Sequence, residues 1–204
     1  MEFAATQSSL SEERLLFREL AHRINNEFAS VANMLSLAAS RTANAEAKTA
    51  LDSVIARLDG YLRVHRALQI PEAGTVIDAS AYLRELCRSI SWSKLDAKNI
   101  DLVFAEQPLS LKSERCWLLA MILYELISNA ARHAFGEDGG EIRVEVAKVG
   151  GLVECRVSDD GMAPVSAGRG QGLKIIKCLA GRLNGEFEQE FGPLGSASRV
   201  IFPA

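Results

Sequence analysis

The chain has 204 residues, of which 48% are hydrophobic and 24% charged, and its net charge is −3 at pH 7. This balance is that of an ordinary soluble globular protein, long enough for one large domain or for a small module beside a compact domain. Lysine and arginine are scattered along the chain, which excludes the clustered basic surface that nucleic acid or anionic lipid requires.

No segment has the composition of a membrane span or an export signal. The longest apolar run, residues 117–124, is far shorter than the roughly 20 residues that cross a bilayer. The chain also does not begin with a basic segment followed by an apolar one, as a signal peptide would. We therefore expect a soluble, cytoplasmic protein without membrane insertion. In keeping with a reducing compartment, and because no CxxC spacing occurs, we expect buried thiols at Cys87, Cys116, Cys155 and Cys178.

The first third of the chain is predicted to form two helices. Residues 11–70 contain almost no turn chemistry, and Ser11 is the expected N-cap of the first helix, followed by acidic residues. Residues 41–47 break this helix, and a second helix is expected over 45–68. The apolar stripe of the first helix is Leu16, Leu20, Ile24, Phe28, Val31, Leu35 and Ala38, and that of the second is Leu51, Val54, Ile55, Leu58, Leu62 and Val64 or His65.

Two long helices joined by a short turn form a hairpin, and a lone hairpin cannot bury such a one-sided stripe. Two hairpins that pair as a four-helix bundle bury both stripes, so we predict a homodimer. Packing against the second half of the same chain is the alternative. Residues 70–74 end the second helix and are the expected hinge.

From Val76 onward the predicted helices and strands alternate. Helices are expected over 80–95, 113–135 and 173–183, and strands over 100–106, 141–149, 152–160, 185–191 and 196–203. This order favours an α+β two-layer sandwich, in which helices cover one face of a sheet.

The polar face of the first helix carries a histidine. At 100° per residue, His22 lies about 170° from the centre of the apolar stripe and is expected to point into solvent. Glu19 and Asn26 share its face, and the small Ala29 leaves room for a visiting molecule. An exposed imidazole can act as a nucleophile, and a nearby carboxylate can orient it and stabilise its proton. Taken alone, this stretch is more simply explained as an ordinary polar helix surface.

The predicted helix over 113–135 carries polar residues suited to phosphates. Glu125, Asn129, Arg132 and His133 fall within an arc of about 100°. A carboxylate and an amide one turn apart can offer oxygen ligands to Mg²⁺, and cations at the helix end can meet phosphate oxygens. A solvent-exposed face with cations at the C-terminal end of the helix dipole explains the same residues.

Two later segments complete a possible nucleotide site. Asp159, at a strand end, can accept a hydrogen bond from an exocyclic amine such as that of adenine, while Gly161 lets the turn pass close to the base. Residues 168–181 form a Gly-rich loop that opens onto a helix, an anion site that is neither a Walker A nor a Rossmann loop. An Asp-Gly turn and an ordinary loop are the simpler alternatives.

The order of these segments resembles the N, G1 and G2 boxes of the GHKL ATP-binding fold, also called the Bergerat fold. Residues 18–39, RELAHRINNEFASVANMLSLAA, resemble the phosphoacceptor helix of HRxxN-type sensor histidine kinases, which are related to the HWE kinases. The resemblance covers residues 15–203. It implies a dimerisation and histidine phosphotransfer hairpin over 1–73 and a catalytic ATP-binding domain over 74–204.

Position by position, the resemblance implies that His22 is the phosphorylated histidine, with Arg23 and Asn26 as its motif partners. Arg23 follows the histidine and cannot serve as a base, so Glu19 is the nearest carboxylate in sequence. Asn26 and Ala29 are expected to belong to the face on which a response-regulator receiver domain docks.

In the second half, the resemblance implies that Asn129 binds Mg²⁺ with Glu125 beside it, and that Asp159 recognises adenine with Gly161 as companion. The residues implied around the phosphates are Arg132, His133, Gly170, Gly172 and Lys174.

Several departures from the family pattern qualify the resemblance. Ala163 replaces the second glycine of D-x-G-x-G, and almost nothing remains for an ATP lid between Ala163 and Gly168. No W-x-E follows the N box, so the strict HWE pattern is not matched. About ten residues precede the first predicted helix, so no sensor domain is expected in the chain.

The resemblance thus implies autophosphorylation of His22 from Mg·ATP, followed by transfer to an aspartate of a response regulator. A histidine phosphotransferase with a degenerate ATP-binding domain is the alternative, favoured by Ala163 and the missing sensor but opposed by the intact Asn129, Asp159 and glycine loop. A GHKL serine kinase is opposed by the helical first 70 residues, and a scaffolding module is the remaining alternative.

Overall fold

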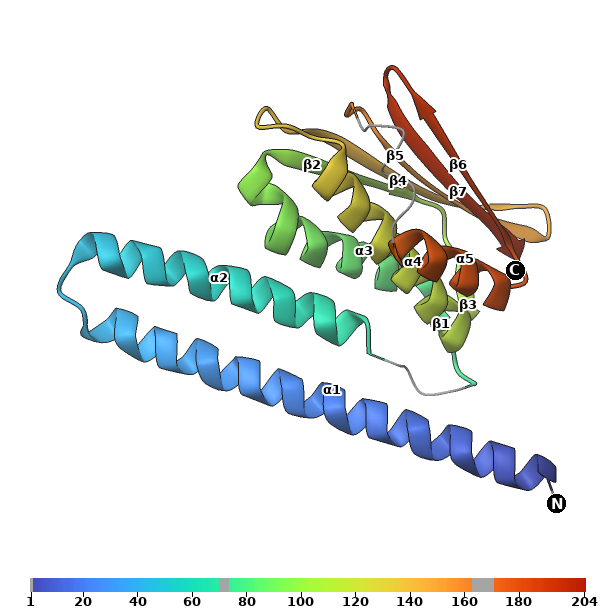
Figure 1. The fold of residues 1–204 in the computed structure, drawn as a ribbon, viewed down its shortest axis with the longest axis horizontal. Helices are drawn as coiled ribbons and strands as arrows, with labels where there is room; N and C mark the ends of the chain where they lie inside the picture. Colours follow the sequence, from blue (N-terminus) through green and yellow to red (C-terminus); the bar gives the residue numbers. More distant parts are fainter. Residues whose placement is uncertain (1, 70–73, 163–170) are drawn as a thin grey trace. The chain divides into compact units, whose positions relative to one another are not determined.

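The computed structural model describes residues 2–69, 74–162 and 171–204, and for residues 2–18 and 21 it describes the backbone path without the side chains. The chain divides into two compact units, Met1–Ile70 and Pro71–Ala204. Figure 1 shows the first unit as helical and the second as a sheet with helices. Each unit is described by itself.

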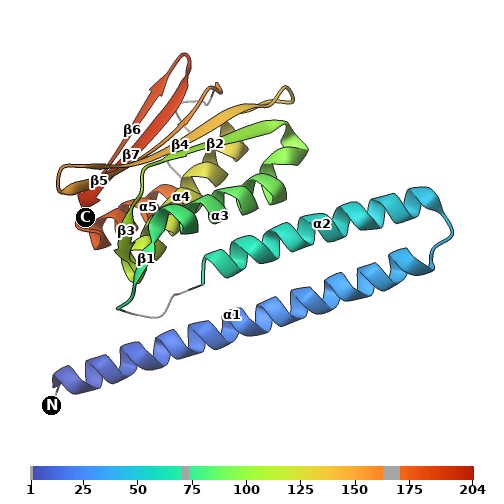
Figure 2. The ribbon, with the colours of Figure 1, turned by 180° about the vertical axis from the view of Figure 1, so that it is seen from behind.

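The first unit is a hairpin of two helices, α1 (Glu2–Arg41) and α2 (Ala45–Ala67), which lie side by side in both views (Figure 1, Figure 2). Helix α1 begins at Glu2, so the predicted N-cap at Ser11 is wrong. Residues 2–10 contain neither glycine nor proline, so nothing in them prevents the helix from continuing. The predicted break is confirmed, because Asn44 caps α2 and its Oδ1 accepts hydrogen bonds from the N–H groups of Glu46 and Ala47 at 2.9 and 3.1 Å.

Fewer residues are buried between the two helices than the predicted apolar stripes contain. Ala32 and Ala39 of α1 are buried, whereas much of the predicted stripe lies at the surface of the single chain. A single neighbouring helix covers only part of a wide apolar face. The large apolar side chains that stay exposed are Leu20, Phe28, Val31, Met34, Leu37, Val54 and Tyr61.

A polar pair lies between the two helices. The buried Asn25 places its Oδ1 3.1 Å from Nδ1 of His65 on α2. Of the two positions that the sequence left open, Val64 is buried, and His65 is half-buried and contacts α1 through Asn25.

The second unit is a two-layer sandwich built on a five-stranded sheet of order β2-β4-β5-β7-β6. Strands β2 and β4 pair in parallel, and the other neighbours pair antiparallel. Helices cover one face of the sheet (Figure 1, Figure 2), which confirms the predicted fold class. The strands are β2 (Ile100–Glu106), β4 (Gly140–Val149), β5 (Leu152–Asp159), β6 (Glu186–Gly192) and β7 (Gly195–Pro203), and the helices are α3 (Ala79–Ile90), α4 (Ser113–His133) and α5 (Gln171–Arg182).

Within the second unit, three helix ends differ from prediction by more than one residue, and one strand pair was not predicted. The helix expected to reach residue 95 becomes α3 followed by a π-helical turn, Ser91–Leu95, and a 3₁₀ turn, Asp96–Lys98. Helix α4 ends at His133 and α5 begins at Gln171, each two residues before the expected position. The short antiparallel pair β1 (Val76–Asp78) and β3 (Ser110–Lys112) was not predicted.

The core of the second unit lies between the sheet and the helices. The inward residues of β4 and β5 alternate with exposed ones, as expected for a sheet with one covered face. The predicted burial is confirmed for Cys87, Cys116 and Cys155, and burial raises the pKa of Cys87 and of Cys116 to about 12. The prediction is wrong for Cys178, which is exposed because α5 turns other positions, among them Ile176 and Leu179, toward the sheet.

Within the described residues, no helix combines the length and the hydropathy that crossing a bilayer requires.

Candidate functional site

His22 lies on the exposed side of α1, as predicted. Its Nδ1 is 3.2 Å from Nδ2 of Asn26, one turn further along the helix. Rotation of the amide by half a turn places Oδ1 at the same point, where it accepts the Nδ1–H of the other histidine tautomer. The lone pair of that tautomer is on Nε2, so Asn26 can hold one ring nitrogen while the other acts as a nucleophile.

Glu19 is paired with Arg23 rather than hydrogen-bonded to the imidazole. Nε of Arg23 donates to Oε1 of Glu19 at 2.9 Å. This hydrogen bond and the charge of Arg23 lower the pKa of Glu19, with a smaller contribution from the charge of His22. Glu19 is therefore an ionised carboxylate near the histidine, and its role as a base stays a prediction.

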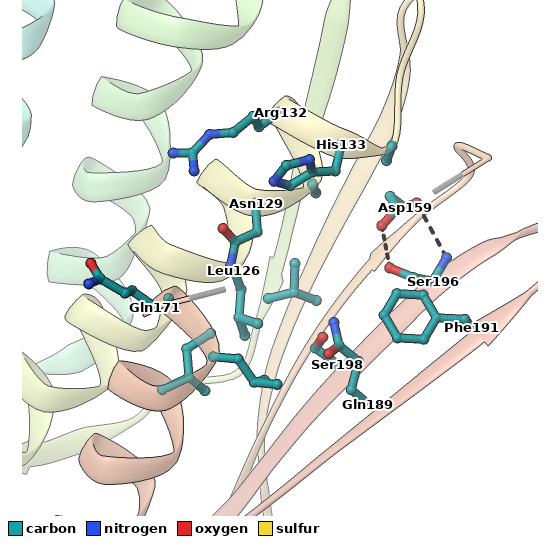
Figure 3. Close-up of a pocket in the computed structure, with 16 residues that line it drawn as sticks. Leu126, Asn129, Arg132, His133, Asp159, Gln171, Gln189, Phe191, Ser196 and Ser198 are labelled. Atoms are coloured by element: carbon teal, nitrogen blue, oxygen red, sulfur yellow. Dashed lines mark hydrogen bonds between the residues drawn. The ribbon is translucent and has the colours of Figure 1, made fainter. Parts of the chain in front are cut away.

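The second unit contains a cavity of about 170 Å³ between the C-terminal half of α4, the start of α5 and strands β5, β7 and β6 (Figure 3). Helices α4 and α5 and strand β5 carry the predicted nucleotide-binding segments, whereas β6 and β7 carry none of them. Among the described residues, its polar lining is Asn129, Arg132, His133, Asp159, Gln171, Gln189, Ser196 and Ser198.

Helix α4 brings three of its four predicted residues to the cavity, namely Asn129, Arg132 and His133. Glu125, one turn earlier, does not line the cavity, but it lies beside Asn129 at the first turn of α5. A Cβ atom added to Gly172 would lie 3.1 Å from both Oε2 of Glu125 and Nδ2 of Asn129. The amide oxygen of Asn129 lies 3.4 Å from the same point. A carboxylate and an amide oxygen side by side are ligands that suit Mg²⁺, so the residues present fit that ion.

Asp159 lies at the end of β5 and is 9% exposed. Its Oδ1 accepts hydrogen bonds from the N–H groups of Gly161 and Ser196 at 3.2 and 3.3 Å, and its Oδ2 accepts one from the Ser196 hydroxyl at 2.6 Å (Figure 3). A carboxylate has about four lone-pair sites, so Asp159 can accept one further donor from the cavity. The adjacent Asp160 instead accepts a hydrogen bond from the N–H of Glu141 at 2.8 Å.

The predicted glycines have different surroundings. Gly161 packs against the end of α4, where an added Cβ would lie 2.2 Å from the carbonyl oxygen of Ala134. Its close approach is therefore to the helix that carries Asn129. Lys174 is exposed and does not line the cavity. Gly170, Ala163 and the predicted lid lie outside the described residues.

Four cavity residues on the last two strands were missed by the sequence interpretation: Gln189, Phe191, Ser196 and Ser198. They belong to no motif, and they meet Asp159 only through the pairing of β7 with β5 and of β6 with β7. The available signal was the alternation itself, because Gln189 and Ser198 occupy inward positions at which a buried sheet face normally carries apolar residues.

Comparison with known proteins agrees with this geometry. A family model described as histidine kinase, HisKA_2, matches residues 19–94. The sensor histidine kinase PdtaS of Mycobacterium tuberculosis is 28% identical over 173 residues, 79% of this chain and 34% of PdtaS. PdtaS of Mycolicibacterium smegmatis is 28% identical over 196 residues, 90% of this chain and 38% of that protein. The chain thus spans about a third of the length of the curated relatives it matches.

Solved structures share the fold. The histidine kinase domain of the Erythrobacter litoralis EL346 blue-light activated histidine kinase has a TM-score of 0.60 at 18% identity, with 86% of this chain and 95% of that chain covered. Full-length ShkA in complex with AMPPNP has a TM-score of 0.53 at 19% identity, with 92% and 45% covered. The chain therefore has the fold of the catalytic domains of histidine kinases. The matched residues 19–94 are the hairpin from Glu19 onward and the start of the second unit, and over this part the chain is similar to sensor histidine kinases.

Proposed function

We propose that this chain is the catalytic core of a two-component histidine kinase that phosphorylates His22 from Mg·ATP and passes the phosphoryl group to a response-regulator aspartate. The observation that carries the proposal is the cavity in which Asp159 and Asn129 converge with the first turn of α5. The presence of AMPPNP in the structure of full-length ShkA supports a nucleotide as its occupant. In this proposal residues 1–73 form the phosphotransfer hairpin and residues 74–204 the ATP-binding domain.

The polar groups in and beside the cavity divide between the base, the phosphates and the metal ion in this proposal. Asp159 accepts a hydrogen bond from the amino group of adenine, and Arg132, His133 and Lys174 balance the phosphate charge with the backbone of Gly170 and Gly172. Glu125 and Asn129 hold Mg²⁺, which supplies neutralisation of the phosphate charge when bound.

At the hairpin, Nε2 of His22 attacks the γ-phosphorus while Asn26 holds Nδ1. A nitrogen–phosphorus bond forms, the bond from the γ-phosphorus to the bridging oxygen breaks, and ADP leaves with that electron pair. The proton on Nδ1 is then released toward the ionised Glu19, the proposed base. Catalysis comes mainly from positioning and charge neutralisation.

The surface of the hairpin supports two partners. A receiver domain would dock on the face that presents His22, Asn26 and Ala29, so that its aspartate reaches the phosphorylated ring. A second copy of the chain would cover the exposed apolar side chains of α1 and α2, which is the proposed homodimer. Such a kinase would act in the cytoplasm, where ATP and receiver domains are present.

Incubation with Mg²⁺ and ATP labelled at the γ-phosphate tests the proposal. The chain should acquire an acid-labile, base-stable label, and His22→Ala should abolish the label while ATP binding persists. Ser30→Ala, at an exposed position two turns further along α1, is the matched control and should be labelled like the unaltered chain. Label that survives His22→Ala, or no label although ATP is bound, would contradict the proposal.

The histidine phosphotransferase alternative differs in one measurable property. Such a protein would accept phosphate from a phosphorylated receiver at His22 without binding ATP. Calorimetric titration with Mg·ATP therefore distinguishes the two functions. Absence of binding, together with His22-dependent transfer from a receiver, would replace the kinase by the relay protein.

A further inference from the structure

The three strands at the cavity align their inward residues in cross-strand rows. Ser196 on β7 pairs with Asp159 on β5 and with Phe191 on β6. Two residues deeper along each strand, Ser198 pairs with Val157 and with Gln189. We call Ser198 and Gln189 the amide row. The next row is apolar and consists of Cys155, Val200 and Phe187.

The amide row is polar where the fold alone would favour apolar side chains. Leu126, Leu173 and Ile176 line the same cavity from α4 and α5. Ser198 is only 4% exposed and Gln189 is half-buried, yet no side-chain hydrogen bond joins either of them to another described residue. Neither polar group is among the fully buried, unpaired side-chain atoms of the described residues, so both are accessible from the cavity, where a bound ligand can form hydrogen bonds with them.

Figure 3 shows Gln189 and Ser198 beside each other in the cavity, on the same side as Asp159 and Ser196. Residues two apart on a strand are separated by about 6.8 Å, a distance comparable to the length of a purine ring system. A planar base that offers its amino group to Asp159 can therefore extend along the strands to the amide row. The carboxylate of Asp159 disfavours an anion here, so the phosphates do not belong in this part of the cavity.

We propose that Gln189 and Ser198 bind the ring edge of the adenine base by donating hydrogen bonds to its ring nitrogens. This inference rests on the proposed function, because it takes ATP as the occupant of the cavity. Adenine presents acceptor nitrogens beside its amino donor, and the Gln189 amide and the Ser198 hydroxyl are donors. Asp159 accepts a hydrogen bond from an amino group and repels a carbonyl oxygen, while the amide row donates to the ring nitrogens. The base is thus recognised both at its amino group and at its ring nitrogens. This makes the site selective for adenine over guanine.

Calorimetric titration of the full chain with Mg·ATP tests the amide row. Gln189→Met and Ser198→Ala each remove one donor at little change of volume, and each should weaken ATP binding by about five- to tenfold without lowering the midpoint of urea unfolding. The matched controls lie on the opposite face of the sheet. Ser158→Ala, paired with Ala197 on β7, and Glu190→Gln, next to Gln189 on β6, should bind ATP like the unaltered chain.

Deaza analogues of ATP identify the contact. The analogue that lacks the nitrogen bound by one donor should bind the unaltered chain less tightly. It should lose no further affinity in the variant that removes this donor, and it should lose affinity in the variant that removes the other donor. Unaltered ATP affinity in both variants would overturn the role of the amide row and leave the kinase proposal intact. Failure of the unaltered chain to bind ATP would overturn both.

Discussion

Gly172 offers a sharp test of the proposed Mg·ATP site, because replacing it should change binding and stability in opposite directions. The residue lies in the first turn of α5, and the Cβ of Gly172→Ala would lie 3.1 Å from Oε2 of Glu125 and from Nδ2 of Asn129. Both atoms are ends of rotatable side chains that can move aside by a few tenths of an ångström. The methyl group therefore fits the fold but displaces the two proposed Mg²⁺ ligands.

The magnitudes follow from this geometry. Moving each side chain off its rotamer costs about 0.5–1.5 kcal/mol in the bound state, or roughly 1–3 kcal/mol for both, which weakens Mg·ATP binding by roughly 5- to 150-fold. The backbone of Gly172 is not in the left-handed region. Alanine at such a position stabilises a fold by about 0.4–1 kcal/mol, because it restricts the unfolded chain. Gly172→Ala should therefore unfold at a higher urea concentration than the unaltered chain.

The assay combines calorimetric titration with ATP, with and without Mg²⁺, and urea unfolding followed by circular dichroism. Gly181→Ala in the same helix is the control, since its Cβ would meet nothing within 4 Å. It should show the gain in stability and no change in binding. Mg·ATP affinity equal to that of the unaltered chain in Gly172→Ala would refute the placement of the metal ligands, and a lower unfolding midpoint would refute the packing argument.

Four further predictions test other parts of the molecule. Gly161→Ala should lower the free energy of unfolding by about 1–3 kcal/mol, because its Cβ would lie 2.2 Å from the carbonyl oxygen of Ala134. Gly151→Ala, whose Cβ would meet nothing within 4 Å, is the control and should not lower it. Equal urea midpoints for the two variants would contradict this packing. Asn26→Ala should slow phosphorylation of His22 by up to about tenfold at unchanged ATP affinity, measured with labelled ATP, and an unchanged rate would exclude a positioning role. A thiol reagent should label Cys178 rapidly in the folded chain and label Cys87, Cys116 and Cys155 only after unfolding, which peptide mapping checks. Burial raises the pKa of Cys87 and of Cys116 from 9.0 to about 12. Above about pH 9 the unfolded chain loses these two protons, whereas the folded chain keeps them up to about pH 12. The free energy of unfolding should therefore fall between about pH 9 and 12.

Local patterns were sufficient for much of the fold and of the site. The arc on α4 follows from helix geometry alone, so Asn129, Arg132 and His133 could be grouped before their surroundings were known. Asp159 was singled out from Asp160 only by the resemblance to the family motif, and the two side chains have different hydrogen-bond partners in the structure. The exposure of His22 likewise follows from the helical period.

Two kinds of contact were not predicted: those in which one side chain has two competing partners, and those that pair strands far apart in the sequence. Glu19 can reach both His22 and Arg23 on one helix face. It forms its ion pair with Arg23, because the planar guanidinium suits a carboxylate. Ser196 meets Asp159 across 37 residues of sequence, through a strand register that no local pattern reveals. Strands β1 and β3 have three residues each, too few to show an alternation.

The last strand in the sheet order has a consequence for how copies of this protein meet. Strand β6 lies at the edge and carries glutamate at alternate positions, Glu186, Glu188 and Glu190, all exposed. An unpaired strand edge is a template for aggregation, and a second β6 aligned against it would bring like charges into register. Repulsion between these carboxylates therefore opposes pairing of two β6 edges and growth of the sheet from one copy to the next. Copies of the chain are expected to associate through surfaces other than this edge.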